Sequence, residues 1–302
     1  MLHGQEVPDY QSVMITNPAV SGSAGDGILR LSYRNLYPGN TFDFHTVSLS
    51  YDSFFPELHG GAGLFVSDEY LGGIINNLTG GLSYSYMFQA TQKIFISAGL
   101  SASLYHRGYD WRNAIFPDQI DPLAGAGIPS AEVIALKGKT VFDLSTGFLF
   151  MTGKFFGGFS VGHLTEPDPS QSDLSDGRLR RTLYVHGAGD FSLSSEKKIR
   201  LLPFGNLSAA RESFSAGAGI SAESGYLSLN GILLTDNNKN LDMQAGFTIT
   251  FTGITMFYSY RFNIISGENL LPFSLQHHTG IALGLNNVDK RKAIKTINFP
   301  KL

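Results

Sequence analysis

A two-residue alternation of apolar and polar side chains runs through most of this sequence, and it constrains the fold more than any other feature. From Ile94 to Leu104 every even-numbered residue is Ile, Ala or Leu, and most odd-numbered residues are Ser or Gly. The same pattern returns from Leu241 to Phe251. Successive side chains of a β-strand point to opposite faces, so each segment is expected to be a strand with one apolar and one small or polar face. The chain is therefore predicted to be all-β.

The number and length of these segments favour a membrane barrel over a soluble fold. The pattern gives about fourteen strands of about ten residues, which suits a tilted strand crossing a bilayer better than a soluble strand of about five or six. The third and ninth patterns are the weakest. Pro203 in the ninth removes a ladder hydrogen bond, so we expect a bulge or a break there. The expected strands start at Gly27, Thr41, Gly61, Leu78, Lys93, Thr140, Lys154, Arg181, Lys198, Ser213, Gly225, Asn240, Gly253 and Pro272.

The positions of the charged residues indicate which face meets lipid. Only 16% of the residues are charged, against about a quarter in soluble proteins. A Lys or Arg on the lipid face at mid-membrane costs roughly 2–4 kcal/mol, and here the apolar series carries no charge through its centre while the other series is rich in Gly, Ser and Thr. We predict a transmembrane antiparallel outer-membrane β-barrel with a crowded or plugged interior. The charged residues on the polar series are Arg30, Arg34, Asp143, Asp190, Asp242 and Arg261.

The connections between the expected strands alternate between tight and long. The segments 89–92, 151–153 and 194–197 are tight, whereas 110–139 and 165–180 are long. Outer-membrane barrels have short periplasmic turns and long extracellular loops, and an even strand number leaves both termini in the periplasm. We therefore expect a periplasmic lead-in at 1–26, a barrel at 27–286 and a periplasmic tail at 287–302. The start of the chain lacks the features of an export signal, so we expect that a signal peptide has been removed.

Several classes of function are excluded or disfavoured. With no cysteine, the chain has no disulfide, thiolate metal site or thiol nucleophile, and a net charge of −3 gives no field that attracts nucleic acid. The glycine clusters fall inside strands and lack the Lys-Ser/Thr of a phosphate-binding loop. No nucleophile elbow, zinc-binding helix or arguable carboxylate pair is present. We therefore expect no enzyme activity, no cofactor and no metal.

The acidic loop at 166–176 leaves two interpretations open. Its carboxylates are oxygen ligands of the kind that calcium prefers, but the spaced acidic pattern of a calcium loop is missing. A solvated acidic loop is the favoured alternative. The residues concerned are Glu166, Asp168, Asp173 and Asp176.

Two motifs near the start of the chain resemble a known family. Residues 11–23 read Gln-Ser-Val-Met-Ile-Thr-Asn-Pro-Ala-Val-Ser-Gly-Ser, and residues 31–39 read Leu-Ser-Tyr-Arg-Asn-Leu-Tyr-Pro-Gly. They resemble the Asn-Pro-Ala-x-x-Gly and Tyr-Arg-x-Gln-Trp-Pro elements of the PorP/SprF family of outer-membrane proteins, part of the type IX secretion system of Bacteroidota. Leu36 and Tyr37 replace the family's Gln-Trp. Shorter similarities follow in order at 50–52, 162–164, 276–278 and 297–302, so the resemblance spans nearly the whole chain.

The resemblance implies a barrel that assists the export and surface anchoring of proteins with a type B C-terminal domain, such as gliding adhesins. The implied partners are that C-terminal domain, other type IX secretion components such as the periplasmic ring or a peptidoglycan-binding lipoprotein, and outer-membrane lipid. The alternative is a diffusion channel or hydrophobic-solute transporter, with the loop 110–139 folded inward. The candidate partner-binding or lumen residues are Asn17, Pro18, Arg30, Arg34, Tyr37, Asp143, His163, Asp190, Asp242 and Arg261.

The Asn-Pro-Ala-x-x-Gly element also has a local physical interpretation. Pro18 biases Asn17 toward an extended conformation, and Gly22 permits a turn. Residues 11–25 are therefore expected to form an ordered, nonhelical lead-in that lies beneath or inside the barrel, with an ordinary flexible terminus as the alternative.

Overall fold

The computed structural model describes residues 13–36, 44–110, 120–121, 125–126, 138–170, 177–194, 199–266 and 276–285. Within these residues every strand expected from the sequence is present. The first residue of each strand lies within four residues of the expected one, and the largest difference is for the last strand, which is expected from Pro272 and begins at Gln276. The strands are β1 (Ile28–Leu36), β2 (Phe44–Phe55), β3 (Gly60–Leu71), β4 (Ile75–Thr91), β5 (Ile94–Tyr109), β8 (Lys139–Met151), β9 (Phe155–Gly162), β10 (Thr182–Gly189), β11 (Phe191–Ser194), β12 (Ile199–Ala209), β13 (Phe214–Ser224), β14 (Leu227–Asp236), β15 (Leu241–Phe251), β16 (Ile254–Ile265) and β17 (Gln276–Gly284). A separate pair, β6 (Ile120–Asp121) and β7 (Gly125–Ala126), lies between β5 and β8 in the sequence.

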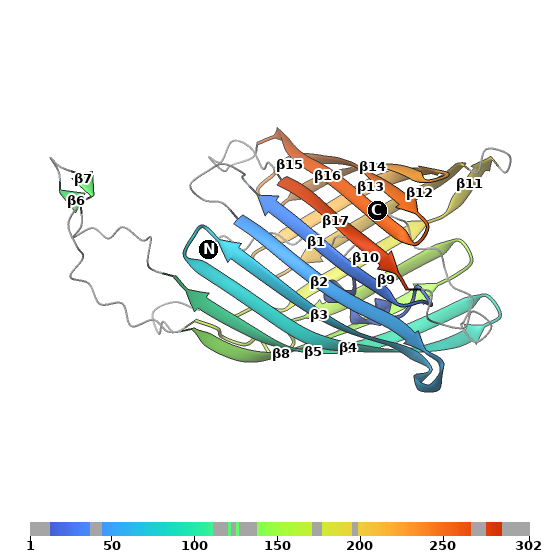
Figure 1. The fold of residues 1–302 in the computed structure, drawn as a ribbon, viewed down its shortest axis with the longest axis horizontal. Helices are drawn as coiled ribbons and strands as arrows, with labels where there is room; N and C mark the ends of the chain where they lie inside the picture. The colour runs from blue at the N-terminus through green and yellow to red at the C-terminus, as the bar shows by residue number, and fades with distance from the viewer. Residues whose placement is uncertain are drawn as a thin grey trace.

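The strands close into an antiparallel barrel (Figure 1). Most strands pair with the next strand along the chain. The exceptions are β5, which pairs with β8, and β10 and β11, which both pair with β12, and the barrel closes where β1 pairs with β17. Counting β10 and β11 as one interrupted strand, the barrel has 14 strands. The predicted fold is confirmed. Among the described residues, no helix is long and apolar enough to cross a membrane.

The alternation places apolar side chains on the outside of the barrel. On β4 and β5, Leu82 is 67% exposed and Leu100 is 59% exposed, whereas their neighbours Ser83 and Ser101 are buried inside. A water-soluble sheet would bury the first pair instead. The outer surface is therefore suited to acyl chains, and the small residues fill the interior.

The prediction of a bulge or break at Pro203 is wrong for the strand that carries it. The pairing of β12 with β13 runs through Pro203 and Ile220 without a register shift. The interruption lies on the other neighbour, between β10 and β11, where Asp190 leaves the strand. Residues 189–190, opposite Leu202 and Pro203, do not pair with β12, whereas β12 itself continues through Pro203 as one strand.

The two ends of the barrel differ in their connections. One end, called the short-turn end, has tight turns such as Thr252–Gly253 between β15 and β16. The other end, called the long-loop end, carries connections 37–43, 110–138, 163–181 and 266–275. Three connections there, 72–74, 210–213 and 237–240, are short, so the predicted asymmetry holds for four of the seven connections at this end.

The lead-in forms two short helical turns inside the barrel, seen in dark blue in Figure 1. They are α1 (Val13–Thr16) and η1 (Pro18–Val20). Asn17 is extended, with φ −132° and ψ 100°, and Gly22 has φ 69°, as expected. The prediction of a nonhelical segment is wrong, because the Asn17 side chain caps η1 and Pro18 occupies the first helical position, where its missing N–H is harmless.

The lipid-facing assignment is tested by Leu100→Arg, with Ser103→Arg on the interior face of the same strand as the control. We expect Leu100→Arg to lower the free energy of unfolding in lipid vesicles by about 2–4 kcal/mol, because an Arg on the lipid face loses its hydration. Ser103→Arg should cost clearly less. Equal losses in guanidinium unfolding curves would contradict the assignment.

Candidate functional site

Residues Val13–Ser23, called the plug, lie in the barrel interior and are held through their backbone. Three wall serines donate hydrogen bonds to plug carbonyls: Ser160 to Thr16 at 2.6 Å, Ser97 to Ala19 at 2.8 Å and Ser85 to Ser21 at 2.7 Å. All three serines are fully buried. They satisfy carbonyl groups that would otherwise be buried without partners, which is costly.

Asn17 is the largest fully buried side chain of the plug, with no exposed surface. Its Oδ1 accepts from the Ala19 N–H at 3.0 Å, and its Nδ2 donates to the Phe148 carbonyl at 3.2 Å. Nδ2 also lies 3.0 Å from Nε2 of His186. Since the amide nitrogen is a donor, Nε2 accepts and the His186 ring is neutral. The Asn17 amide thus connects the plug to β8 and β10.

Glycines in the wall make room for the plug backbone. A Cβ at Gly99 would collide with Pro18 and Ala19, and a Cβ at Gly147 would collide with the Asn17 side chain. These positions show why the interior face of the wall is rich in glycine: only a bare backbone permits this close approach.

An ion pair fixes the end of the plug. The Gly22 N–H donates to Oδ2 of Asp52 at 2.7 Å, and the other oxygen of this carboxylate accepts from Arg30. Asp52 is almost fully buried. Arg30 neutralises a carboxylate that would otherwise be buried and unpaired, so this predicted lumen residue supports the plug.

An apolar cluster fills the interior around the plug. Val13, Ala19 and Val20 pack with inward side chains of the wall from β8, β9, β10, β12 and β14. Such packing excludes water between the plug and this part of the wall. The wall residues of the cluster are Leu149, Met151, Phe156, Ala188, Phe204, Ile232 and Leu234.

A cavity of about 230 Å³ lies between the plug and the long-loop end. Ile15 and Thr16 of the plug line it on one side. It reaches Leu71, Ala210 and Ser213, which lie at the long-loop ends of their strands or in the turn that follows. The barrel is therefore filled at the level of the plug and hollow toward the long-loop end.

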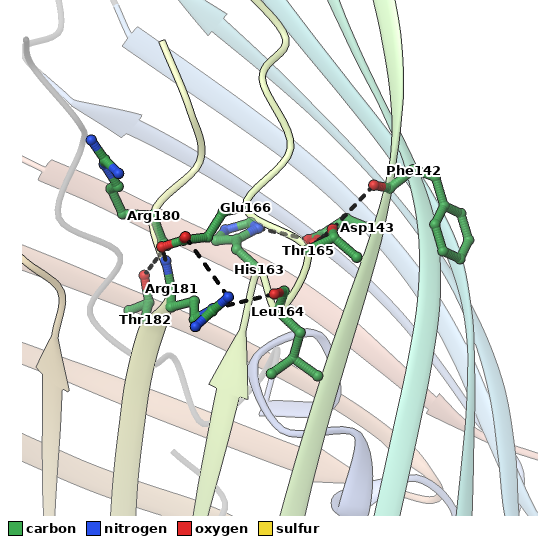
Figure 2. A network of polar contacts seen from close by, with 9 residues as sticks. All are labelled: Phe142, Asp143, His163, Leu164, Thr165, Glu166, Arg180, Arg181 and Thr182. Atoms are coloured by element: carbon green, nitrogen blue, oxygen red, sulfur yellow. Dashed lines mark hydrogen bonds and ion pairs between the residues drawn. The ribbon is translucent and has the colours of Figure 1, made fainter. Parts of the chain in front are cut away.

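The connection between β9 and β10 is tied to the rim of this cavity (Figure 2). Asp143 on β8 accepts from His163 at 2.7 Å and from Thr165 at 2.9 Å. Arg181 forms an ion pair with Glu166 at 3.8 Å. His163 and Glu166 adopt left-handed conformations, with φ of 55° and 43°, so the turn has a defined and strained shape.

In the described part of the acidic loop, the Asp168 carboxylate already accepts hydrogen bonds from the loop itself. Asp168 accepts from the amide and hydroxyl of Ser170, which hold the pKa of its carboxyl below the usual range. Lys139 donates to the Ser170 carbonyl. Asp173 and Asp176 lie outside the described residues, and no group of three potential metal ligands occurs in the part that is described.

Of the remaining predicted residues that the structure describes, Asp242 and Arg261 are brought together, and Arg34 and Asp190 lie elsewhere on the wall. Asp242 and Arg261 pair at 3.4 Å, and Asp190 pairs with Arg200. Arg34 lies opposite Thr46 and His278 in the strand register, near the long-loop end. Tyr37 lies outside the described residues. The role of all these residues in partner binding stays a prediction.

The sequence reasoning missed several residues that shape this interior. Glu69, Asn77 and Arg107 line the cavity, and His186 contacts the plug. All four fall on the inward series of their strands, so the alternation could have placed them in the lumen. Nothing in the sequence indicated which of them meet.

The fold defines the class of protein: an outer-membrane β-barrel, similar in fold to solved channels. One is a mutant of TodX, described as a monoaromatic hydrocarbon channel, with 12% identity, coverage of 91% of this chain and 94% of that chain, and a TM-score of 0.55. Another is the toluene transporter TbuX of Ralstonia pickettii, with 11% identity, coverage of 90% and 92%, and a TM-score of 0.54. A comparison with curated protein sequences gave no match.

The family model described as type IX secretion system membrane protein PorP/SprF matches residues 9–278. The chain belongs to this family, and the resemblance noted in its sequence motifs is confirmed.

The seat of the plug is tested by Gly99→Val, with Gly231→Val as the matched control because a Cβ at Gly231 meets open space. The chain has no cysteine, so Val20→Cys in both backgrounds supplies a unique thiol on the plug. Overpacking costs about 1–3 kcal/mol, so Gly99→Val should raise the rate of maleimide labelling at least about fivefold. Gly231→Val should not. Equal labelling rates would show that Gly99 does not seat the plug.

Proposed function

We propose that this barrel assists the export and surface anchoring of proteins that carry a type B C-terminal domain, for example gliding adhesins. Membership of the PorP/SprF family supports a place in type IX secretion. The structural observation that carries the proposal is the plug, which fills the lumen at its own level and leaves a polar cavity toward the long-loop end. A barrel of this shape is suited to holding a partner at its mouth.

The proposed orientation places the short-turn end in the periplasm, after removal of a signal peptide. In this orientation the lead-in 1–26 and the tail 287–302 are both on the periplasmic side of the barrel 27–286. The cavity faces the outside, where an exported C-terminal domain arrives. The short-turn end is left to contact the periplasmic ring or a peptidoglycan-binding lipoprotein. The barrel acts without enzyme chemistry.

The alternative is a channel or a transporter of hydrophobic solutes, which is how the two solved neighbours are described. Their identity to this chain is 12% and 11%, so the likeness concerns the fold. The packed cluster around the plug argues against passage through this lumen. Most of the loop 110–139, expected to fold inward in this alternative, lies outside the described residues.

The proposal is tested by deleting the gene and following the type B cargo. We expect the cargo to remain inside the cell or to appear in the medium, because nothing holds its C-terminal domain at the surface. Antibody labelling of intact cells measures surface display, and expression of the wild-type barrel from a plasmid is the control. Unchanged display in the deletion strain would reject the proposed function.

Conductance in a planar bilayer separates the two functions. We expect the purified wild-type barrel to show no steady open pore, since the apolar cluster of the plug and wall excludes water and ions. Gly99→Val, which displaces the plug, should give intermittent openings. A steady conductance of the wild-type protein would favour the channel.

A further inference from the structure

One interior arginine differs from the others in its partners. Arg107 on β5 has no carboxylate within ion-pair distance in the described chain, although it lines the cavity. Arg34 on the same rim also lacks one there, but it is not among the cavity-lining residues. The interior arginines with carboxylate partners are Arg30 with Asp52, Arg200 with Asp190 and Glu223, and Arg261 with Asp242.

Neutral groups hold Arg107 in place. Its Nε donates to Oδ1 of Asn77 at 2.9 Å, and its Nη2 donates to the Tyr105 hydroxyl at 2.9 Å. The guanidinium carbon lies 5.6 Å from the centre of the Tyr105 ring, a cation–π distance. A guanidinium has five N–H donors in a fixed fork. The edge formed by Nη1 and the second Nη2 hydrogen therefore has no acceptor within the described residues.

The carboxylate of Glu69 is linked to Arg107 only through the side-chain amide of Asn77. Glu69 accepts from Nδ2 of Asn77 at 3.0 Å, and Asn77 in turn accepts from Arg107. The three residues lie side by side on β3, β4 and β5 in the strand register. Glu69 thus orients Asn77 and lowers the local positive potential without pairing with the guanidinium.

Two other basic side chains, His163 and Arg180, line the same cavity, and both already have interaction partners. His163 is hydrogen-bonded to Asp143, and Arg180, just before β10, has interactions of its own. Asp143 is itself occupied by His163 and Thr165. The guanidinium edge of Arg107 is therefore the group in this cavity that is prepared for an anion.

We propose that Arg107 binds a carboxylate of the exported partner, supplied either by the end of its chain or by an acidic side chain. A planar guanidinium edge matches a carboxylate in two parallel hydrogen bonds. A cavity of about 230 Å³ is smaller than the usual small-molecule pocket, so it admits the end of a chain or one side chain and not a folded domain. This inference rests on the proposed function for the identity of the partner, but not for the chemistry of the site.

Peptide binding to the purified full-length barrel in detergent tests the chemistry. The probes are three N-acetylated Gly-Ser hexapeptides, unlabelled and followed by calorimetry: one with a free C-terminal carboxylate, one with a C-terminal amide, and one amide with a central Glu. We expect the free acid, the Glu peptide or both to bind at least about tenfold more tightly than the plain amide. Whichever of the free-acid peptide and the Glu peptide binds more tightly identifies the source of the carboxylate. Equal binding of all three would overturn the proposal.

Substitutions assign the effect to this guanidinium. Arg107→Gln should abolish the preference for the carboxylate, and Glu69→Gln should strengthen it, because a competing negative charge is removed. Arg211→Gln is the matched control, since it removes the same charge from an exposed turn at the same end. An unchanged preference in Arg107→Gln, at normal yield of folded barrel, would contradict the proposal.

Cells separate this inference from the proposed function. Arg107→Gln should reduce surface display of the cargo toward the level of the deletion strain, and Arg211→Gln should not. Normal display in Arg107→Gln with lost display in the deletion strain would refute the role of Arg107 and leave the proposed function intact. Normal display in the deletion strain, together with carboxylate binding that depends on Arg107, would refute the proposed function but leave the carboxylate-binding site at Arg107 intact.

Discussion

Lipid offers no hydrogen bonds, and the wall of this protein follows from that constraint. A strand that crosses a bilayer must have all its backbone groups paired with other strands, which only a closed sheet achieves. The pairing of β1 with β17 and of β10 with β12 closes this one. The break at Asp190 is tolerated because the residue turns to Arg200 and its own N–H donates to the Lys154 carbonyl.

A closed wall creates a second problem, because the interior it encloses must be either wet or filled. Here the plug fills it, and the plug brings backbone groups of its own that need partners. The serines and glycines of the wall meet this need together: the serines donate to plug carbonyls, and the glycines let the two backbones approach. The apolar cluster around Val20 adds the packing that excludes water.

The sequence predicts the wall well and the interior poorly, for a physical reason. Alternation is a local property, so strand positions, the lipid face and the inward direction of Asp143 or Arg261 follow from the residues themselves. Contacts across the lumen join residues far apart in sequence, such as Asn17 with His186 and Phe148, and no local pattern encodes them. Pro203 shows a finer limit. Its effect was expected on its own strand, but the neighbouring strand carries the break.

The position of the plug in the chain has a consequence for the order in which the molecule assembles. The plug precedes β1, yet its hydrogen-bond partners in the wall lie on strands from β2 to β10, while the last strand, β17, pairs with β1. A barrel that closed first would have to admit a segment through a lumen already occupied by wall side chains. Assembly is easier when the early strands first pack around the plug and β17 pairs with β1 last. The plug that fills the finished barrel would then also serve as the template around which the strands of the wall assemble.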